Sequence, residues 1–346
     1  MVTKKTLSNE ARLEARLRAN LHQHKETEGK YKALQDELNR TQIALSQALR
    51  ITKYQPKVFA IPAPRNLTRS SATAVAMASD WHVDELVPKH KVNGLNEYNP
   101  EIAKKRAAKF FELVVRFIRV DRQESDVNNL LLWLGGDFFT SSTMHDANCA
   151  FPPVIATMYA QDLLVSGIQY LLEQEPNLNI HVVGSVGNHS RLSGSAQPVN
   201  VSQEQELSLE WMMYHALRAQ FRECKRLTFQ LDNSYHSYVE VMGRTIRFNH
   251  GHIGWRYNDG MGGVHGPLWK VLSQRWDKQI KAAVTVCGHY HTMTPAAPGR
   301  PYTVNGSLIG PSPYSLSFGA EPPMQGYFLM HSRYGIVEQR PLFVDS

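Results

Sequence analysis

The chain has 346 residues, of which 42% are hydrophobic and 20% charged, and its formal net charge is +7. It is long enough to bury a large core, and it has no run of 18 or more apolar residues, which excludes an obvious membrane-spanning segment. Three widely spaced cysteines and a first segment without an apolar signal core argue against a disulfide-bonded secreted protein, so we expect a soluble cytoplasmic protein with no membrane partner.

Residues 1–52 are predicted to form a basic helical arm. Residues 1–65 contain 13 Lys or Arg against six Asp or Glu, so this region carries the whole net charge. The alternating spacing of three and four that marks the a/d positions of a coiled coil recurs at Tyr31, Leu34, Leu38, Thr41, Leu45 and Ala48. Such a helix either pairs with a second copy of the chain, which makes a homo-oligomer, or packs its apolar stripe on the rest of the chain.

A linker over residues 53–70 is predicted because Pro56, Pro62 and Pro64 cannot continue a helix. Residues 71–346 are then expected to form one α/β domain.

Helices and extra strands are expected between the polar motifs of this domain. Apolar residues at helical spacing predict helices over 100–120, 153–172 and 203–221, and Asn99-Pro100 is typical of a helix start. A further strand is expected over 303–309, followed by a hairpin over 327–344.

Five short polar motifs each follow a strand-like apolar run. The motifs are Asp80-Trp81-His82, Gly136-Asp137, Gly187-Asn188-His189, His250-Gly251-His252 and Gly288-His289-Tyr290-His291. Ligands of open α/β sheets bind beyond the carboxyl ends of the strands, so five such ends can meet in one crevice. Every motif contains at least one side chain that can bind a metal ion, and together the motifs predict a site for two metal ions.

Asp137 is the candidate bridge between the two ions. Divalent ions roughly 3.5 to 4 Å apart need a shared anionic oxygen, and Asp137 ends the longest apolar run. Asp80 and His82 lie two residues apart on a segment expected to be extended, which would point both side chains to the same side. His289 and His291 repeat this spacing.

The order and spelling of the motifs resemble the calcineurin-like metallophosphoesterase family, whose pattern is Asp-x-His, Gly-Asp, Gly-Asn-His, His-Gly and Gly-His-x-His. The match covers the chain from Ser79 to His291. The resemblance implies an α/β fold of the αββα four-layer sandwich type. It also implies two divalent metal ions, with Mn²⁺ expected first and Zn²⁺, Fe²⁺, Ni²⁺ or Mg²⁺ as alternatives.

The resemblance also implies a role for each residue. Seven metal ligands are carried over: Asp80, His82, Asp137, Asn188, His250, His289 and His291. His252 is the alternative to His250 as a ligand, and otherwise it would line the substrate cleft. His189 is carried over as a catalytic residue that is not a ligand and that protonates the leaving group, because imidazole has a pKa near neutrality.

Two positions depart from the family pattern, and both bear on the surroundings of the ligands. Thr140 stands where a supporting Asp is usual, and Ser190-Arg191 stands where an acidic residue usually follows the His. Arg191 could contact a substrate phosphate or be a solvated loop charge. Trp255 and Arg256 could stack on a base beside a phosphate, although packing of the aromatic residue is an equal alternative.

The function expected from these residues is a phosphodiesterase, a nuclease that hydrolyses nucleic acid through attack by a hydroxide bridging two metal ions. It would be similar to the SbcD-type nuclease branch, with the basic arm contacting phosphates, and would suit a phage-encoded or bacterial enzyme that acts alone. One alternative is a phosphatase or phosphodiesterase for small molecules or phosphoproteins. The other is an inactive phosphoesterase-fold interaction protein.

Overall fold

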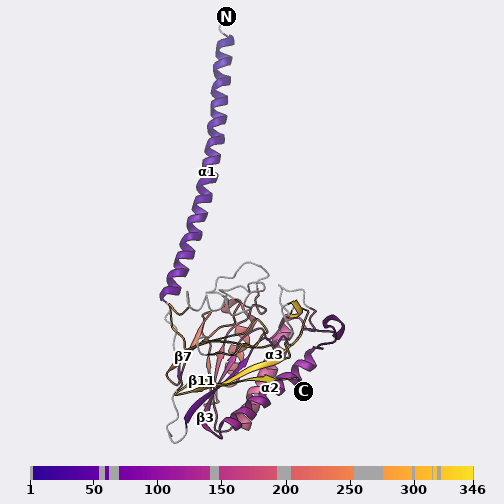
Figure 1. Cartoon of the computed structure of the whole chain (residues 1–346). Coiled ribbons are helices and arrows are strands. Elements are labelled where there is room, and N and C mark those ends of the chain that lie inside the picture. Colours follow the sequence, from indigo (N-terminus) through magenta and orange to yellow (C-terminus); the bar gives the residue numbers. More distant parts are fainter. Residues whose placement is uncertain are drawn as a thin grey trace. The chain divides into compact units, whose positions relative to one another are not determined.

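The structure is a computed structural model, and it describes residues 3–53, 59–61, 70–140, 148–192, 204–252, 276–297, 301–313, 315–317 and 321–345. The chain divides into two compact units, Met1–Gln55 and Pro56–Ser346. The first contains one helix, α1 (Thr3–Lys53) (Figure 1). Along the part of α1 whose side chains are described, the large apolar residues are exposed: Leu17, Leu21, Tyr31, Leu34 and Leu38. No helix in the described ranges combines the length and the apolar character needed to cross a membrane.

The second unit is a mixed α/β structure with two mixed sheets. One sheet has six strands, β2 (Ser70–Ala78), β3 (Ser125–Leu134), β4 (Asn179–Gly184), β5 (Leu227–Gln230), β10 (Met324–His331) and β11 (Gly335–Phe343). Their order is β11-β10-β2-β3-β4-β5, in which β2 to β5 are parallel and β10 is antiparallel to both of its neighbours.

The other sheet has five strands in the order β1-β6-β7-β8-β9. They are β1 (Phe59–Ile61), β6 (Ser237–Val241), β7 (Arg244–Phe248), β8 (Val284–Cys287) and β9 (Tyr302–Val304). Strand β1 lies inside the segment expected to be a linker, and it pairs in parallel with β6. The second unit therefore includes residues that precede the predicted domain boundary.

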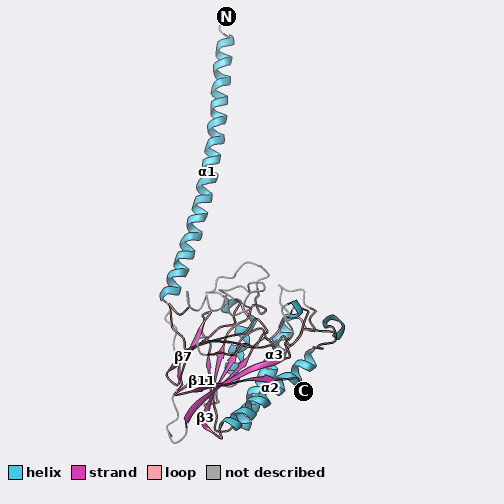
Figure 2. Ribbon diagram, in the orientation of Figure 1, coloured by secondary structure: helices cyan, strands magenta, loops and turns pink. Residues whose placement is uncertain are grey.

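The core has two parts because the central strands bury both of their faces. On β3, Leu130 and Leu132 pack with the helices, while Leu131 and Trp133 pack with residues of β6, β7 and β8. The second unit therefore has a helix layer, the six-stranded sheet and then the five-stranded sheet, and Figure 2 shows helices beside the strands. The predicted α/β class is confirmed. The second helix layer of an αββα sandwich is not found among the described residues.

Three helices cover the outer face of the six-stranded sheet: α2 (Pro100–Asp121), α3 (Pro153–Gln174) and α4 (Leu209–Gln220). The first two agree with the predicted ranges, and Asn99 caps α2 by accepting a hydrogen bond from the Ile102 backbone N–H. Helix α4 begins later than predicted because Ser208 has an extended backbone and caps the helix through the Trp211 N–H.

The predicted C-terminal hairpin is confirmed by β10 and β11, which pair antiparallel. The strand expected over 303–309 is wrong in extent, since β9 ends at Val304. Strand β10 pairs with β2, and Gln325 accepts hydrogen bonds from Ser79 N and Trp81 Nε1 at 3.0 and 3.1 Å. The hairpin therefore supports the segment that leads to Asp80.

Candidate metal centre

The five polar motifs follow the carboxyl ends of β2, β3, β4, β7 and β8. Each run of strand residues ends within a few positions of its motif, as the sequence predicted. Backbone hydrogen bonds join the segments that follow these strands: Asp80 N–H donates to Gly136 O, and Gly288 N–H donates to His250 O. Chain segments far apart in sequence are therefore held together at one edge of the two sheets.

Five candidate ligands have a left-handed backbone, which is uncommon outside glycine. Asp80, His82, Asp137, His289 and His291 have φ values of 57°, 49°, 53°, 71° and 55°. Only three other non-glycine residues of the described ranges have positive φ. Such strain concentrates at functional sites, where the surrounding structure holds it in place. The expected extended segment at Asp80 and His82 is wrong, because β2 ends at Ala78 and both residues turn into the left-handed region.

Two motif glycines are required by the close approach of carboxylates. A Cβ atom at Gly187 would lie 2.0 Å from Asp137 Oδ1, and one at Gly288 would lie 2.4 Å from Asp80 Oδ2. Both distances are far below van der Waals contact. The glycines therefore allow the backbone of one motif to pack against the acidic side chain of another.

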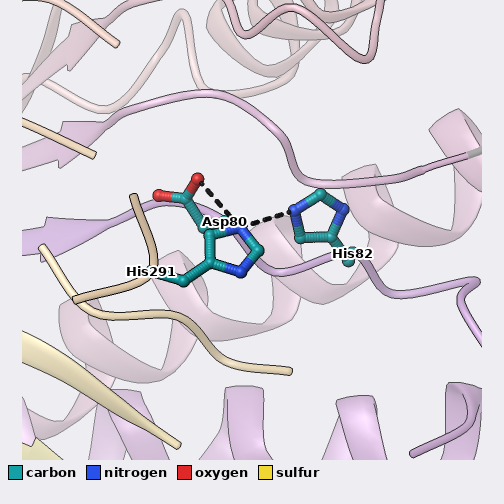
Figure 3. Close-up of side chains that lie close together, drawn as sticks. All are labelled: Asp80, His82 and His291. Atoms are coloured by element: carbon teal, nitrogen blue, oxygen red, sulfur yellow. Dashed lines mark hydrogen bonds and ion pairs between the residues drawn. The ribbon is translucent and has the colours of Figure 1, made fainter. Parts of the chain in front are cut away.

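One cluster consists of Asp80, His82 and His291. Their side chains point toward one another (Figure 3). His291 Nε2 lies 3.2 Å from His82 Nε2 and 3.6 Å from Asp80 Oδ1. One ligand atom from each residue lies within 4.8 Å of the others, so the group can hold one metal ion.

Asp137 belongs to two further clusters of this kind, one with His82 and His189 and the other with His250 and His289. Its Oδ2 lies 2.9 Å from His250 Nε2, and its Oδ1 accepts a hydrogen bond from the His189 backbone N–H at 2.9 Å. Two groups of imidazoles thus share Asp137, as they would share a bridging carboxylate.

His250, rather than His252, faces Asp137. The Nδ1 of His250 lies 2.7 Å from the Gly135 carbonyl oxygen, which directs Nε2 into the cluster. His252 Nε2 instead lies 2.6 Å from Glu204 Oε1. Among the described residues, His252 is in no group that could hold an ion.

The charges of these groups suit a cation. Burial, together with neighbouring histidines, lowers the pKa of His82 and His289 well below its usual value and that of His291 to about 4, so these imidazoles are neutral and can donate lone pairs. Burial opposes charging of His250, but the Asp137 carboxylate outweighs it and raises the His250 pKa to about 10. His250 therefore carries a proton that faces Asp137, and a metal ion could take the place of this positive charge.

Asn188 provides a separate sign that the site fits a metal ion. Its Oδ1 atom is buried and accepts no hydrogen bond from the described residues. A buried carbonyl oxygen without a donor is unfavourable, and a hard divalent ion is a suitable partner for it. The carboxylates, imidazoles and amide together make an acceptable ligand set for two divalent ions.

Arg191 and His252 are joined by Glu204, which sequence reasoning missed. The Arg191 Nε donates to Glu204 Oε1 at 2.9 Å, and its Nη2 bonds the same oxygen. Glu204 is almost fully buried, and His252 and Arg191 lower its pKa although burial alone would raise it. One edge of the Arg191 guanidinium is therefore already used, so the expected two-pronged contact with phosphate cannot use that edge.

Glu210 was also missed, and it supports two motifs at once. It is fully buried in the first turn of α4, where Oε1 accepts the Phe138 N–H and Oε2 accepts the Gly187 N–H, both at 2.8 Å. Burial raises its pKa to about 7. Neither Glu204 nor Glu210 lies in a recognisable motif, so only their position in the fold reveals them.

Trp255 and Arg256 lie outside the described residues, so their expected role stays a prediction.

No protein-family model and no curated protein matches this sequence. The residues and their geometry are therefore the basis for assigning a function.

Replacing Glu210 with Gln should destabilise the metal-free protein by about 1 to 3 kcal/mol, because the new amide N–H₂ would face a backbone N–H that now has an acceptor. Urea unfolding measures this change. Glu206→Gln is the matched control, since Glu206 is exposed four residues earlier. Equal stability of the two variants would contradict the supporting role of Glu210.

Proposed function

We propose that this protein is a phosphoesterase that uses two divalent metal ions and hydrolyses phosphodiester bonds of nucleic acid. The observation that carries the proposal is that two groups of histidines share Asp137, while Asp80 forms a third group with His82 and His291. The buried Oδ1 of Asn188, which has no donor among the described residues, adds to it. The motif order and the two face-to-face sheets further support membership of the calcineurin-like metallophosphoesterase family and its αββα fold.

The proposed ligands fall into two sets that share Asp137. One ion would be held by Asp80, His82, Asp137 and His291, and the other by Asp137, Asn188, His250 and His289. Ions bound in this way lower the pKa of water and neutralise charge that develops on the phosphoryl oxygens.

His189 is proposed to donate a proton to the leaving-group oxygen. Its ring lies 4.9 Å from that of His82, and its backbone N–H is anchored on Asp137. This hydrogen bond fixes the backbone of His189 beside the proposed ligands and leaves its imidazole to serve as an acid. A leaving alkoxide departs slowly unless it is protonated. The His189 imidazole is therefore needed for esters with poor leaving groups.

The arm favours nucleic acid over a small substrate. Residues 66–346 have no net charge, whereas the region before them carries +7. Basic side chains on a helix contact phosphates of any sequence and release counterions. The exposed leucines at coiled-coil spacing additionally support pairing of two arms, which would place two basic helices side by side.

Hydrolysis should require metal and should favour diesters. We expect purified protein with Mn²⁺, Zn²⁺, Ni²⁺ or Mg²⁺ to cleave a bis-ester and DNA faster than a mono-ester.

Asp137→Asn should lose bound metal and most activity, because a neutral amide cannot hold two dications together. Asp126→Asn, at the start of strand β3 and therefore far along the strand from Asp137, is the control. Metal content by mass spectrometry together with turnover checks this, and full activity in Asp137→Asn would refute the site.

His189→Ala should retain both metal ions and lose on the order of 10² to 10⁴ in rate for esters with poor leaving groups. Nitrophenyl esters should lose much less, because nitrophenolate departs without a proton. The measurement is a plot of rate against leaving-group pKa for both proteins. Equal losses for all esters, or loss of metal, would instead make His189 a ligand or a structural residue.

The arm can be tested for charge and for pairing separately. Replacing Arg18, Lys25, Lys32 and Arg40 with Gln removes four exposed charges outside the a/d positions. This variant should keep its oligomeric state but bind DNA more weakly, with a flatter salt dependence.

Leu34→Asn with Leu38→Asn is the matched variant, which keeps the charge and should reduce the mass measured by light scattering. Both variants should hydrolyse a small bis-ester normally. Unchanged DNA affinity and salt slope in the charge variant would remove the main support for a nuclease.

A further inference from the structure

A chain of polar groups lies behind His82, on the side away from the other ligands. His82 Nδ1 lies 2.5 Å from Thr140 Oγ1, and the Thr140 hydroxyl donates to Glu85 Oε2 at 3.1 Å. The direct distance from Glu85 Oε2 to His82 Nδ1 is 4.0 Å, which is too long for a hydrogen bond. Thr140 therefore connects the carboxylate to the imidazole.

The direction of the protons in this chain follows from what His82 must do. Its Nε2 lies 3.2 Å from His291 Nε2 and faces the cluster that could hold an ion. An imidazole that offers an Nε2 lone pair carries its hydrogen on Nδ1, so His82 donates to the Thr140 hydroxyl. The hydroxyl then donates its own hydrogen to Glu85 Oε2.

The hydroxyl is held in place by the surrounding backbone. Thr140 is buried, and its N–H donates to Asp84 Oδ1 at 2.7 Å. The Glu85 N–H donates to His82 O at 3.0 Å, so Glu85 and His82 are also tied by a tight turn. Thr140, Asp84 and Glu85 thus fix the orientation of the His82 ring.

We propose that Thr140 and Glu85 are positioning residues that set the tautomer and the ring orientation of His82 for metal binding. This inference rests on the proposed metal-dependent function. Outer partners of metal-binding histidines raise ligand basicity and hold the ring, and losing one typically weakens metal affinity about 10- to 100-fold. The threonine hydroxyl carries the influence of a carboxylate that by itself lies too far away.

The test is calorimetric titration of metal-free protein with Mn²⁺. Thr140→Val removes the hydroxyl with little change in shape, and it should weaken one of two sites about 10- to 100-fold, whereas Thr140→Ser should bind as the wild type does. Glu85→Gln should weaken the same site. The double variant should be no worse than Thr140→Val alone, because Glu85 acts through Thr140.

Thr73→Val is the matched control, since Thr73 is fully buried on β2 and its hydroxyl has no partner among the described residues. Thermal unfolding of the metal-free variants checks that each one folds. A second readout is bis-ester hydrolysis, in which the Thr140→Val defect should disappear at saturating Mn²⁺. A purely structural defect would not be restored by metal.

The outcomes separate this proposal from the proposed function. Tight Mn²⁺ binding in Thr140→Val, or a loss in Thr140→Ser as large as that in Thr140→Val, would overturn the positioning role while leaving the metal site intact. Additive losses in the double variant would overturn the connection through Thr140. A wild-type protein that binds no divalent ion would overturn the proposed function and this inference with it.

Discussion

The buried carboxylate of Asp137 is the group on which the rest of the site depends. It accepts the His189 backbone N–H, lies 2.9 Å from His250 Nε2 and forces position 187 to be glycine. An uncompensated negative charge in such a place is strongly unfavourable, so the structure surrounds it with donors. The motifs after β3, β4 and β7 are therefore arranged around one charge.

Backbone strain is the second constraint, and it is distributed over the same residues. A non-glycine residue in the left-handed region costs of order 1 to 3 kcal/mol, and five candidate ligands adopt it. Hydrogen bonds hold two of these turns: His82 N–H donates to Asp137 O, and His289 N–H donates to the Asp80 carboxylate. Trp81, which lies between Asp80 and His82 in the sequence, is fully buried and packs edge-on against Phe138. Packing of these loops thus maintains left-handed backbone conformations at the candidate ligands that would be unfavourable in an isolated segment.

Much of this arrangement could be predicted from sequence because strands and their ends have local signatures. The apolar runs located β2, β3, β4, β7 and β8, and Asn99-Pro100 located the start of α2. The left-handed turns at Asp80 and His82 could not be predicted, because a two-residue spacing fits extended and turned backbones equally. Glu85, Glu204 and Glu210 act on partners up to 72 residues away, as Glu210 does on Phe138, and no spacing rule connects such pairs. The sequence marks Thr140 only as a departure from the family pattern, whereas in the fold it contacts His82 and Glu85.

The pairing of β2 with β10 has a consequence for how the protein is made. Ser79 and Gln325 bond across 246 residues of sequence, and β2 has β10 as its neighbour on one side. Contacts between such distant segments form late, because a long loop must close first. On the ribosome, β2 keeps an open edge that can pair with other chains until the hairpin of β10 and β11 emerges. Assembly of the segment that leads to Asp80 therefore waits for β10, and a chain interrupted before β10 is prone to aggregate.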